Sequence, residues 1–363
     1  MAELSITATL APLSIEMSTP YSPIPLSGHG PGPVNKKSYL VGLDALRAVA
    51  ALSVCLFHFS GGTLPKLIVP ATKLAFSKGY VGVDIFFVIS GFIIPYSLVG
   101  KNHQIGDFSA FLKKRVLRIN PPAYISILLV MGQWFLIDKV ISQTSHYIGN
   151  LSWGQIINNL LFTVPFTNYK WISGIFWTLA IEFQFYLFIG LLFNVLFTRS
   201  LVWFVGLYLL ASALSFLPHA EAVGFLHYSP LFALGGMALL WQQRRVSWGV
   251  YVASLFVFGA LIFWQMQIYS SLVGVGTAVA INSIKFRIPG FSFLGKISYS
   301  LYLMHVLIGT TAEFVLTKLL PPTSDARKML LTAICLLLAI GGSYLFYRIV
   351  ELPFMRMVTQ KRS

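Results

Sequence analysis

Residues 40–60, LVGLDALRAVAALSVCLFHFS, are almost entirely apolar between positions 41 and 59. At about 1.5 Å of rise per residue, a helix of this length crosses a bilayer core of about 30 Å. The run nevertheless contains Asp44, Arg47 and His58. An ionisable side chain at mid-depth in a membrane helix costs about 2.5–3.5 kcal/mol on insertion scales. These three residues therefore need an explanation beyond the span itself.

The spacing of these residues places two of them on one face of the helix. Arg47 and His58 are 11 residues apart, which at about 100° per residue is three turns plus roughly 20°, and about 16 Å along the axis. Asp44 precedes Arg47 by three residues, close enough for an intrahelical ion pair. Two interpretations remain open: a polar seam between packed helices, or one polar face of a site that runs through the membrane.

The composition identifies a membrane protein. Apolar residues make up 56% of the 363 residues and charged residues only 10%, against about 25% charged residues in soluble domains. We therefore predict an all-α fold, a polytopic membrane helix bundle. The net charge of +15 is what basic cytoplasmic loops produce, so we expect no nucleic-acid partner. Cys55 and Cys335 lie in apolar runs, which argues against a disulfide framework, and we expect no metal.

About ten transmembrane helices are predicted from apolar runs of spanning length. With the N-terminus in the cytoplasm, 17 basic residues fall on the cytoplasmic side and eight on the outer side, as the positive-inside rule favours. An even number of spans then places both termini in the cytoplasm. The predicted spans are 41–59, 80–99, 121–141, 175–197, 201–217, 227–242, 248–264, 268–284, 297–318 and 329–349.

The two ends of the chain are predicted to be cytoplasmic tails. Residues 1–38 are rich in Ser, Thr, Pro and Gly, a composition that cannot bury enough apolar surface to fold, so we predict disorder there. No basic segment precedes the short apolar run of this tail, and we expect no cleavable signal peptide. Residues 357–363 form the second predicted tail.

The predicted topology places two carboxylates where they can act on His58. Asp84 lies near the outer end of the second span, at about the depth of His58. Glu182 lies about two turns into the fourth span, and Tyr186 follows four residues later on the same face. A carboxylate beside a histidine fixes its tautomer and raises its basicity. For Asp84, the favourable helix dipole at a wet interface is an equally good explanation.

Further polar residues have competing explanations. Arg115 and Arg118 share a helix face on the cytoplasmic side, either as flanking charges or as a clamp for phosphates. Ser298, Tyr302 and His305 stand at positions i, i+4 and i+7 of the ninth span. His305 is then either a buried, hydrogen-bonded structural residue or part of a stripe that faces a shared cavity.

The end of the tenth span carries Arg348, Glu351 and Pro353 at the inner surface. We interpret Arg348 and Glu351 as a local ion pair. Pro353 is interpreted as a helix stop, because proline lacks the N–H group that a helix interior requires.

Six motifs follow one another along the chain: LDALRAVAALSVCLFHF (43–59), GYVGVDIFFVISGFII (79–94), RVLRINPP (115–122), FWTLAIEFQFY (176–186), KISYSLYLMH (296–305) and VELPF (350–354). Together they resemble the acyltransferase-3 family of integral membrane acyltransferases, many of which O-acetylate cell-surface polysaccharides and oligosaccharides. The resemblance covers residues 39–356, which we expect to form one acyltransferase-3 transmembrane domain.

The resemblance also implies which residues act. The family pattern has an Arg or Lys, then ten residues, then a His, and Arg47 and His58 match it. Arg115 and Arg118 match the family's cytoplasmic Arg-x-x-Arg, and Glu182 matches the Glu of its fourth span. The family's Ser-Tyr and His stripe corresponds to Ser298, Tyr299 and His305. Many relatives carry a C-terminal extracytoplasmic esterase-like domain, and here we expect transfer within the membrane domain or with a separate partner.

The leading hypothesis is a membrane O-acyltransferase. It would move an acyl group, with acetyl as the expected case, from cytoplasmic acyl-CoA to a hydroxyl of a cell-surface or exported polysaccharide or oligosaccharide. Acetyl-CoA is the expected donor, with its phosphates on Arg115 and Arg118 and with Arg47 deeper in the bundle. His58 would be the general base on the acceptor hydroxyl, a role that typically contributes about 10²–10⁴-fold.

The remaining catalytic candidates support His58. Glu182 or Asp84 is expected to orient it. The candidates for the substrate site are Tyr186, Ser298, Tyr302 and His305, of which the first three carry hydroxyl groups that can donate to a developing oxyanion. Because the donor is cytoplasmic and His58 lies near the outer surface, either the CoA arm threads the bundle or a covalent acyl-enzyme relays the group.

A rival hypothesis is a transporter or flippase of a glycan precursor, since ten helices with intramembrane Arg, Glu and His fit that class as well. A signalling or scaffold protein is a third. For the acyltransferase, we expect a multi-pass protein of the bacterial inner membrane. Its expected partners are membrane lipids, acyl-CoA, a glycan acceptor such as an exopolysaccharide, and polysaccharide-assembly proteins.

Overall fold

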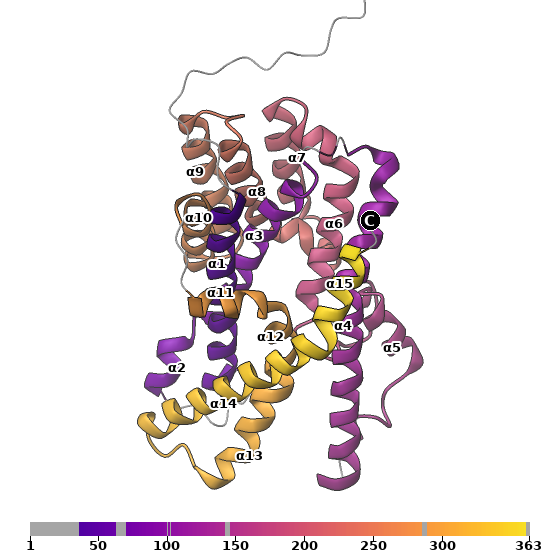
Figure 1. Ribbon diagram of the computed structural model, residues 1–363, viewed down its shortest axis with the longest axis vertical. Coiled ribbons are helices and arrows are strands. Elements are labelled where there is room, and N and C mark those ends of the chain that lie inside the picture. Colours follow the sequence, from indigo (N-terminus) through magenta and orange to yellow (C-terminus); the bar gives the residue numbers. More distant parts are fainter. Residues whose placement is uncertain are drawn as a thin grey trace, which may run out of the picture.

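The computed structural model of the chain describes residues 36–62, 70–99, 101, 103–141, 146–284 and 289–360. Within these ranges all regular structure is helical (Figure 1). The α-helices are α1 (Lys36–Phe57), α2 (Pro70–Phe76), α3 (Gly82–Tyr96), α4 (Phe108–Leu136), α5 (Trp153–Leu160), α6 (Trp177–Phe197), α7 (Leu201–Leu214), α8 (Gly224–Gln242), α9 (Trp248–Gln265), α10 (Ile268–Ser283), α11 (Pro289–Lys296), α12 (Ser298–His305), α13 (Thr311–Leu319), α14 (Asp325–Phe346) and α15 (Leu352–Gln360).

Short helical turns join or extend these helices. Turns of π-helix follow α4, α12 and α14, as η5 (Ile137–Ile141), η8 (Val306–Thr310) and η9 (Tyr347–Glu351). The segment η1 (His58–Gly62) follows α1 and is kinked at Gly61, whose φ is 123°. Turns of 3₁₀-helix are η3 (Gly79–Val81), η4 (Ile105–Asp107), η6 (Val164–Phe166) and η7 (Ala220–Ala222). In Figure 1, α14 and α15 run diagonally across the front of the bundle and pass over the lower part of α12.

Seven helical segments in the described part of the chain are long and apolar enough to cross a membrane, which confirms the predicted all-α membrane bundle. They are Gly42–Gly61, Pro70–Tyr96, Ile105–Lys139, Trp177–Phe197, Trp248–Gln265, Ser298–Leu319 and Asp325–Met357. The shorter apolar helices α7 and α10, together with α8, coincide with the other three predicted spans. The number of ten spans and the cytoplasmic placement of both ends stay predictions.

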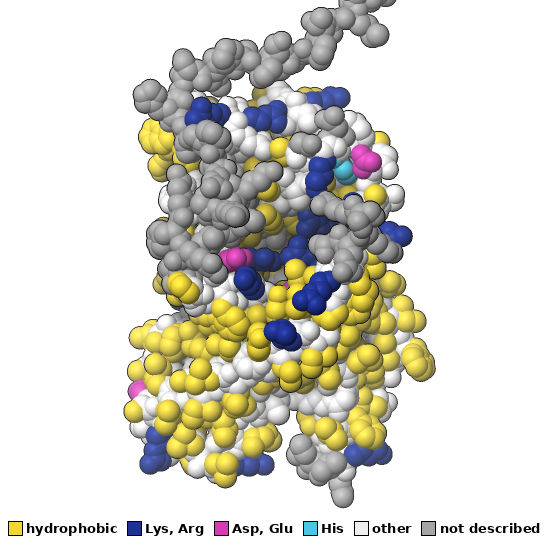
Figure 2. All heavy atoms as spheres, in the orientation of Figure 1, with side chains coloured by type: hydrophobic (Ala, Val, Ile, Leu, Met, Phe, Trp, Pro, Cys, Tyr) yellow, Lys and Arg dark blue, Asp and Glu magenta, His cyan; other side chains and the backbone are white. Residues whose placement is uncertain are grey.

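The surface is divided in the way a membrane protein requires. Figure 2 shows hydrophobic side chains as a broad band across the lower half of this face. Above that band, Lys and Arg side chains gather around a hollow in which acidic side chains are also visible. The band presents apolar surface to lipid, while the charged groups collect where water or a polar ligand can reach them.

The helices α3 and α8 pack closely, because two glycines allow their backbones to touch. A Cβ atom on Gly91 would lie 2.1 Å from the Phe232 carbonyl oxygen, and one on Gly235 would lie 2.0 Å from the Val88 carbonyl oxygen. Small residues permit such contact between membrane helices, whose association depends on packing rather than on water exclusion. This contact holds α3, and with it one wall of the site described below.

Two sequence-based expectations concern the ends of helices. The predicted helix stop at Pro353 is wrong: the chain passes through η9 and continues as α15, with Pro353 in its first turn. Proline is tolerated there because the first N–H groups of a helix have no intrahelical partner. The predicted tail 1–38 lies outside the described residues except for its last three positions, which begin α1, and 361–363 lie outside them as well.

Candidate functional site

A cavity of about 280 Å³ lies in the middle of the bundle, between α1, α3, α4, α6, α12 and η9. We call it the central cavity. Its lining residues are Leu43, Asp44, Arg47, Val83, Phe86, Phe87, Ile89, Ser90, Ile93, Ile94, Arg115, Arg118, Ile119, Thr178, Leu179, Glu182, Tyr186, Ser298, Tyr299, Tyr302 and Glu351. Seven of the ten residues predicted from the sequence as site residues line it: Arg47, Arg115, Arg118, Glu182, Tyr186, Ser298 and Tyr302.

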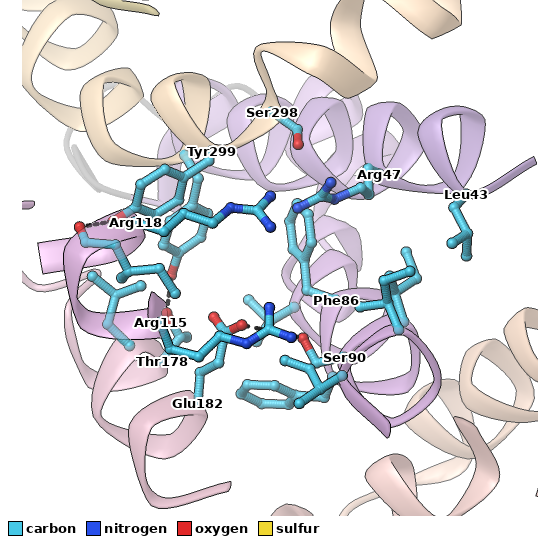
Figure 3. Close-up of a pocket in the computed structure, with 18 of the residues that line it drawn as sticks. Leu43, Arg47, Phe86, Ser90, Arg115, Arg118, Thr178, Glu182, Ser298 and Tyr299 are labelled. Carbon is cyan, nitrogen blue, oxygen red and sulfur yellow. Dashed lines mark hydrogen bonds between the residues drawn. The ribbon is translucent and has the colours of Figure 1, made fainter. Parts of the chain in front are cut away.

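The charged groups of the central cavity balance one another. The cations are Arg47, Arg115 and Arg118, and the carboxylates are Asp44, Glu182 and Glu351. Figure 3 shows the guanidinium groups of Arg47 and Arg118 turned toward each other across the cavity, with Arg115 beside Glu182 and Ser90 on another wall. The buried Nε of Arg47 has no hydrogen-bond partner among the described residues. The cavity therefore offers a free buried donor although its formal charges cancel.

Glu182 is held by hydroxyl groups from two helices. The Tyr186 hydroxyl donates a hydrogen bond of 2.5 Å to Glu182 Oε1, which confirms that these two residues share a face of α6. Ser90 of α3 donates to the same oxygen at 3.4 Å. The carboxylate thus has a fixed orientation in the central cavity. Its predicted role of orienting His58 stays a prediction.

Arg115 and Arg118 lie where the central cavity meets a second one. Both residues line the central cavity and also a second, basic cavity of about 400 Å³ near the start of α4. The Arg115 Nη2 donates to Ser97 Oγ at 2.6 Å, and its guanidinium lies over the Phe111 and Tyr186 rings, 5.5 and 5.7 Å from their centroids. These contacts fix Arg115 between the two cavities.

The second cavity, which we call the basic cavity, has a strong excess of positive charge. Its lining residues are Ser97, Leu98, Lys101, His103, Asp107, Ala110, Phe111, Lys114, Arg115 and Arg118. Four of them are Lys or Arg and one is acidic, so the formal charge of the lining is +3 with His103 neutral. A surface of this kind attracts anions with several charges, and Arg provides bidentate contacts to phosphate.

Residues of α12 form another wall of the central cavity. The Tyr302 hydroxyl lies 2.6 Å from Thr178 Oγ1 and donates to the Ile175 carbonyl oxygen at 3.0 Å. The Tyr299 hydroxyl donates to the Ile119 carbonyl oxygen at 2.7 Å, which ties α12 to α4 next to Arg118. Ser298 lines the cavity at the start of the same helix.

The two predicted histidines lie outside the central cavity and next to each other. The ring centroids of His58 and His305 are 5.1 Å apart. His305 is fully buried, its Nδ1 lies 2.7 Å from the Tyr302 carbonyl oxygen, and its Nε2 has no partner among the described residues. Nδ1 must then carry the proton, and Nε2 of the neutral ring is an acceptor. Because the rings of Tyr302 and His305 are 5.7 Å apart, a continuous series of rings joins the cavity to His58.

Asp84 occupies a different place from the other predicted site residues. It is buried on α3, lines neither of the two cavities, and lies near Ser270 of α10. Its Oδ2 atom has no hydrogen-bond partner among the described residues. The structure therefore separates Asp84 from Glu182, and its predicted catalytic role stays a prediction.

The sequence interpretation misassigned Glu351 and did not single out two polar residues of the central cavity, Ser90 and Thr178. Glu351 was interpreted as the partner of Arg348, which is wrong: Glu351 is buried, lines the cavity and accepts a 2.5 Å hydrogen bond from Ser300, whereas Arg348 is exposed and donates to Tyr344. Ser90 was not singled out, although it carries the hydroxyl of the otherwise apolar run 85–94. A polar side chain within an apolar run is the signal that identifies Ser90 and Glu351.

No group of three or more His, Cys, Asp or Glu residues within the described ranges has the arrangement that holds a metal ion.

Comparison with known proteins gives both a family and relatives. The model of the acyltransferase-3 family, described as "Acyltransferase domain", matches residues 40–348. The chain is 32% identical over 160 residues to the "Putative peptidoglycan O-acetyltransferase YrhL" of Bacillus subtilis, an alignment that covers 41% of this chain and 23% of the relative. It is 33% identical over 174 residues to the "O-acetyltransferase OatA" of Staphylococcus aureus, with 44% and 26% covered.

A third relative is the "Putative O-acetyltransferase SACOL0978" of Staphylococcus aureus, 32% identical over 164 residues, with 42% of this chain and 24% of the relative covered. The aligned part is thus about a quarter of the length of these relatives. No solved structure matches the chain.

Proposed function

Because the chain belongs to the acyltransferase-3 family, we propose that it is a membrane O-acyltransferase that uses cytoplasmic acyl-CoA as donor and a hydroxyl of a polysaccharide or oligosaccharide as acceptor. The observation that carries the proposal is a pair of cavities that share two arginines in their linings. One is strongly basic, the other is balanced in charge, and Arg115 and Arg118 belong to both. This division matches a donor with a polyanionic end and a neutral reactive end.

The basic cavity suits the nucleotide end of acyl-CoA, which carries several phosphate charges. Lys101, Lys114, Arg115 and Arg118 can pair with these charges. Each charge pair near a protein surface contributes about 1–4 kcal/mol before desolvation, depending on the local dielectric. Lys101 and Lys114 are exposed, so each of their charge pairs should contribute an energy at the lower end of that range. The partly buried Arg115 and Arg118 should therefore provide most of the affinity for the phosphates.

The central cavity suits the neutral thioester end. Its cations and carboxylates cancel in number, so a polyanion gains little by entering. Ligand cavities are usually about 300–1,000 Å³, and 280 Å³ therefore fits a small acyl group with a short part of its arm. The free Nε of Arg47 is a donor for the thioester carbonyl oxygen or for a group beside it. These features favour acetyl as the transferred group.

The proposed chemistry is acid–base catalysis by His58. The His58 imidazole accepts the proton of the acceptor hydroxyl as its oxygen forms a bond to the thioester carbonyl carbon. The C–S bond then breaks, and the leaving thiolate of CoA takes the proton that His58 accepted, which returns the imidazole to its starting form. The donor proposed for an oxyanion that develops in the central cavity is the Ser298 hydroxyl, because the hydroxyls of Tyr186 and Tyr302 already donate to Glu182 and to the Ile175 carbonyl oxygen.

The route between the central cavity and His58 passes Tyr302 and His305. The ring distances of 5.7 and 5.1 Å along this series support a short path within the protein. Both routes expected from the sequence remain part of the proposal: movement of the donor arm past Tyr302, or transfer through an acyl-enzyme. Labelled protein recovered after incubation with labelled acyl-CoA alone favours the acyl-enzyme.

The acceptor and the location follow from the relatives by analogy. One relative is named a peptidoglycan O-acetyltransferase, and we propose a cell-surface polysaccharide or its precursor as the acceptor. The bacterial inner membrane is the proposed location, with membrane lipids and polysaccharide-assembly proteins as partners.

The test of the proposed function uses purified protein in lipid nanodiscs. With acetyl-CoA and an oligosaccharide acceptor, free CoA and acetylated acceptor should form together. Arg115→Ala and Arg118→Ala each remove charge-assisted bonds worth about 1.5–3 kcal/mol, so the KM for acetyl-CoA should rise by about 10–150-fold. The matched control is Lys113→Ala, an exposed cation on the same helix that lines neither cavity.

A transporter or flippase gives the opposite result in the same assay. It releases no CoA, and in sealed vesicles it moves a glycan precursor across the membrane. CoA release that does not depend on Arg115 and Arg118 would contradict the proposed donor site.

A further inference from the structure

An ion pair lies buried in the bundle outside both cavities. Lys328 of α14 donates a hydrogen bond to Glu313 Oε1 of α13, and both side chains are 0% exposed. The other carboxylate oxygen of Glu313 has no partner among the described residues. Removing two charges from water is costly, and a well-packed apolar pair often serves stability equally well. The presence of this pair therefore calls for a role other than stability.

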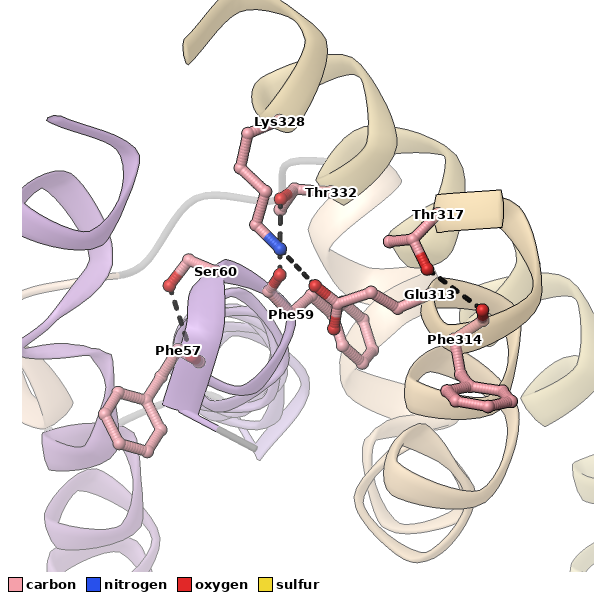
Figure 4. A network of polar contacts seen from close by, with 8 residues as sticks. All are labelled: Phe57, Phe59, Ser60, Glu313, Phe314, Thr317, Lys328 and Thr332. Carbon is pink, nitrogen blue, oxygen red and sulfur yellow. Dashed lines mark hydrogen bonds and ion pairs between the residues drawn. The ribbon is translucent and has the colours of Figure 1, made fainter. Parts of the chain in front are cut away.

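Thr332, a neighbour of Lys328 on α14, contacts Phe59, the residue that follows His58. Thr332 lies one turn after Lys328 on α14, so both side chains face the same neighbour. The Thr332 hydroxyl donates to the Phe59 carbonyl oxygen at 3.4 Å. Figure 4 shows Lys328 and Thr332 descending from α14 toward this carbonyl, with the Glu313 carboxylate approaching from α13.

Glu313, the other member of the ion pair, is joined to His305 through the chain. The helix α13 that carries Glu313 follows η8, and η8 follows His305 directly. His58 stands at the junction of α1 and η1, and η1 is kinked at Gly61, whose φ of 123° lies outside the helical region. Turns of π-helix occur often at functional sites, because the extra residue re-aims the side chains around it. His305 therefore lies at the edge of a π-turn, and His58 lies at the start of a kinked segment.

The segments η1 and η8 contact each other through Phe59. Its ring lies 6.4 Å from the His305 ring, centroid to centroid. A Cβ atom on Gly309 of η8 would lie 2.1 Å from two carbons of the same ring, so only glycine fits there. A shift of η8 relative to η1 thus changes the separation of His58 and His305.

We propose that Glu313 and Lys328 are positioning residues, whose buried ion pair fixes η1 against η8 and thereby sets the mutual placement of His58 and His305 for catalysis. This inference rests on the acyl-transfer function proposed above. An ion pair with one hydrogen-bonded geometry determines the register of two helices, whereas apolar side chains pack acceptably in several registers.

The decisive variant is the double substitution Glu313→Leu with Lys328→Met. It removes both charges at similar volume and leaves no charge unpaired. The matched control is Arg327→Met, the exposed cation beside Lys328. With acetyl-CoA in nanodiscs, kcat of the double variant should fall by about 10²-fold, as expected for a misplacement of about 1 Å. The KM for acetyl-CoA should stay unchanged, because the pair lies outside both cavities.

Two further measurements guard against a variant that fails to fold. Thr332→Val keeps the shape of the side chain and removes the bond to Phe59, and it should also lower kcat without changing KM. The rate at which diethylpyrocarbonate modifies His58, read by mass spectrometry, reports the placement of the ring without reference to turnover. It should change in the double variant and in Thr332→Val, and not in Arg327→Met.

The outcomes separate this inference from the function on which it rests. A wild-type protein that releases no CoA and acetylates no acceptor overturns the proposed function, while the modification rates still decide the positioning role. An active wild type with a folded double variant of equal kcat and equal His58 modification overturns the inference. A rise in KM with kcat unchanged overturns it as well.

Discussion

Neutralising Lys328 alone should destabilise the protein far more than neutralising Lys328 and Glu313 together. In Lys328→Met the Glu313 carboxylate loses the hydrogen bond to its Oε1, and its Oε2 already has no partner. Breaking a fully buried pair from one side costs about 3–5 kcal/mol, because an uncompensated charge stays behind. That is a large fraction of a typical unfolding free energy of about 5–15 kcal/mol.

The double variant Glu313→Leu with Lys328→Met should recover most of that loss. Replacing a buried ion pair by apolar residues of similar volume is often neutral or stabilising by about 1–4 kcal/mol. Both side chains are 0% exposed, so water cannot solvate a remaining charge, and the two substitutions should be strongly non-additive. We expect the double variant to be more stable than either single variant by about 3 kcal/mol.

The assay is unfolding in detergent micelles by sodium dodecyl sulfate, followed by the fluorescence of the eight Trp residues. The control is Arg327→Met, whose exposed side chain donates to Thr323 and whose loss should change stability by no more than about 0.5 kcal/mol. Single-variant losses that simply add up in the double variant would refute the reasoning, since a buried pair must couple.

Three further substitutions test the packing and the cavity. Gly91→Ala should destabilise the protein by about 1–3 kcal/mol, because its Cβ would lie 2.1 Å from the Phe232 carbonyl oxygen. In the control variant Gly276→Ala the new Cβ meets nothing within 4 Å, so this variant should be neutral or stabilising. Equal melting temperatures of the two variants would contradict this. Tyr186→Phe removes the 2.5 Å bond to Glu182 and should cost about 1.5–3 kcal/mol in unfolding free energy, and an unchanged value would mean that the bond contributes nothing. Glu351→Gln keeps an acceptor for Ser300 but leaves three cations against two carboxylates in the central cavity. The added attraction for the anionic donor is about 1 kcal/mol, so the KM for acetyl-CoA should fall by about fivefold. A higher KM would show that the charge acts through something other than donor binding.

The membrane bundle and part of the site were accessible from local sequence patterns. Apolar runs mark helices because a backbone in lipid must satisfy its own hydrogen bonds. The bond between Glu182 and Tyr186 follows from a spacing of four residues on one helix. The shared position of Arg115 and Arg118 follows in the same way from a spacing of three.

The contacts that join different helices were decided by tertiary packing. His58 and His305 are 247 positions apart in the chain, and Ser300 and Glu351 are 51 apart. No periodicity relates such residues, because the distance between two helices depends on which side chains interdigitate and where glycines let backbones touch. For the same reason, Glu351 was assigned to its near neighbour Arg348 rather than to the cavity. Hydropathy and helical period thus determine which segments cross the membrane and which residues share a face, while packing between helices determines which faces meet.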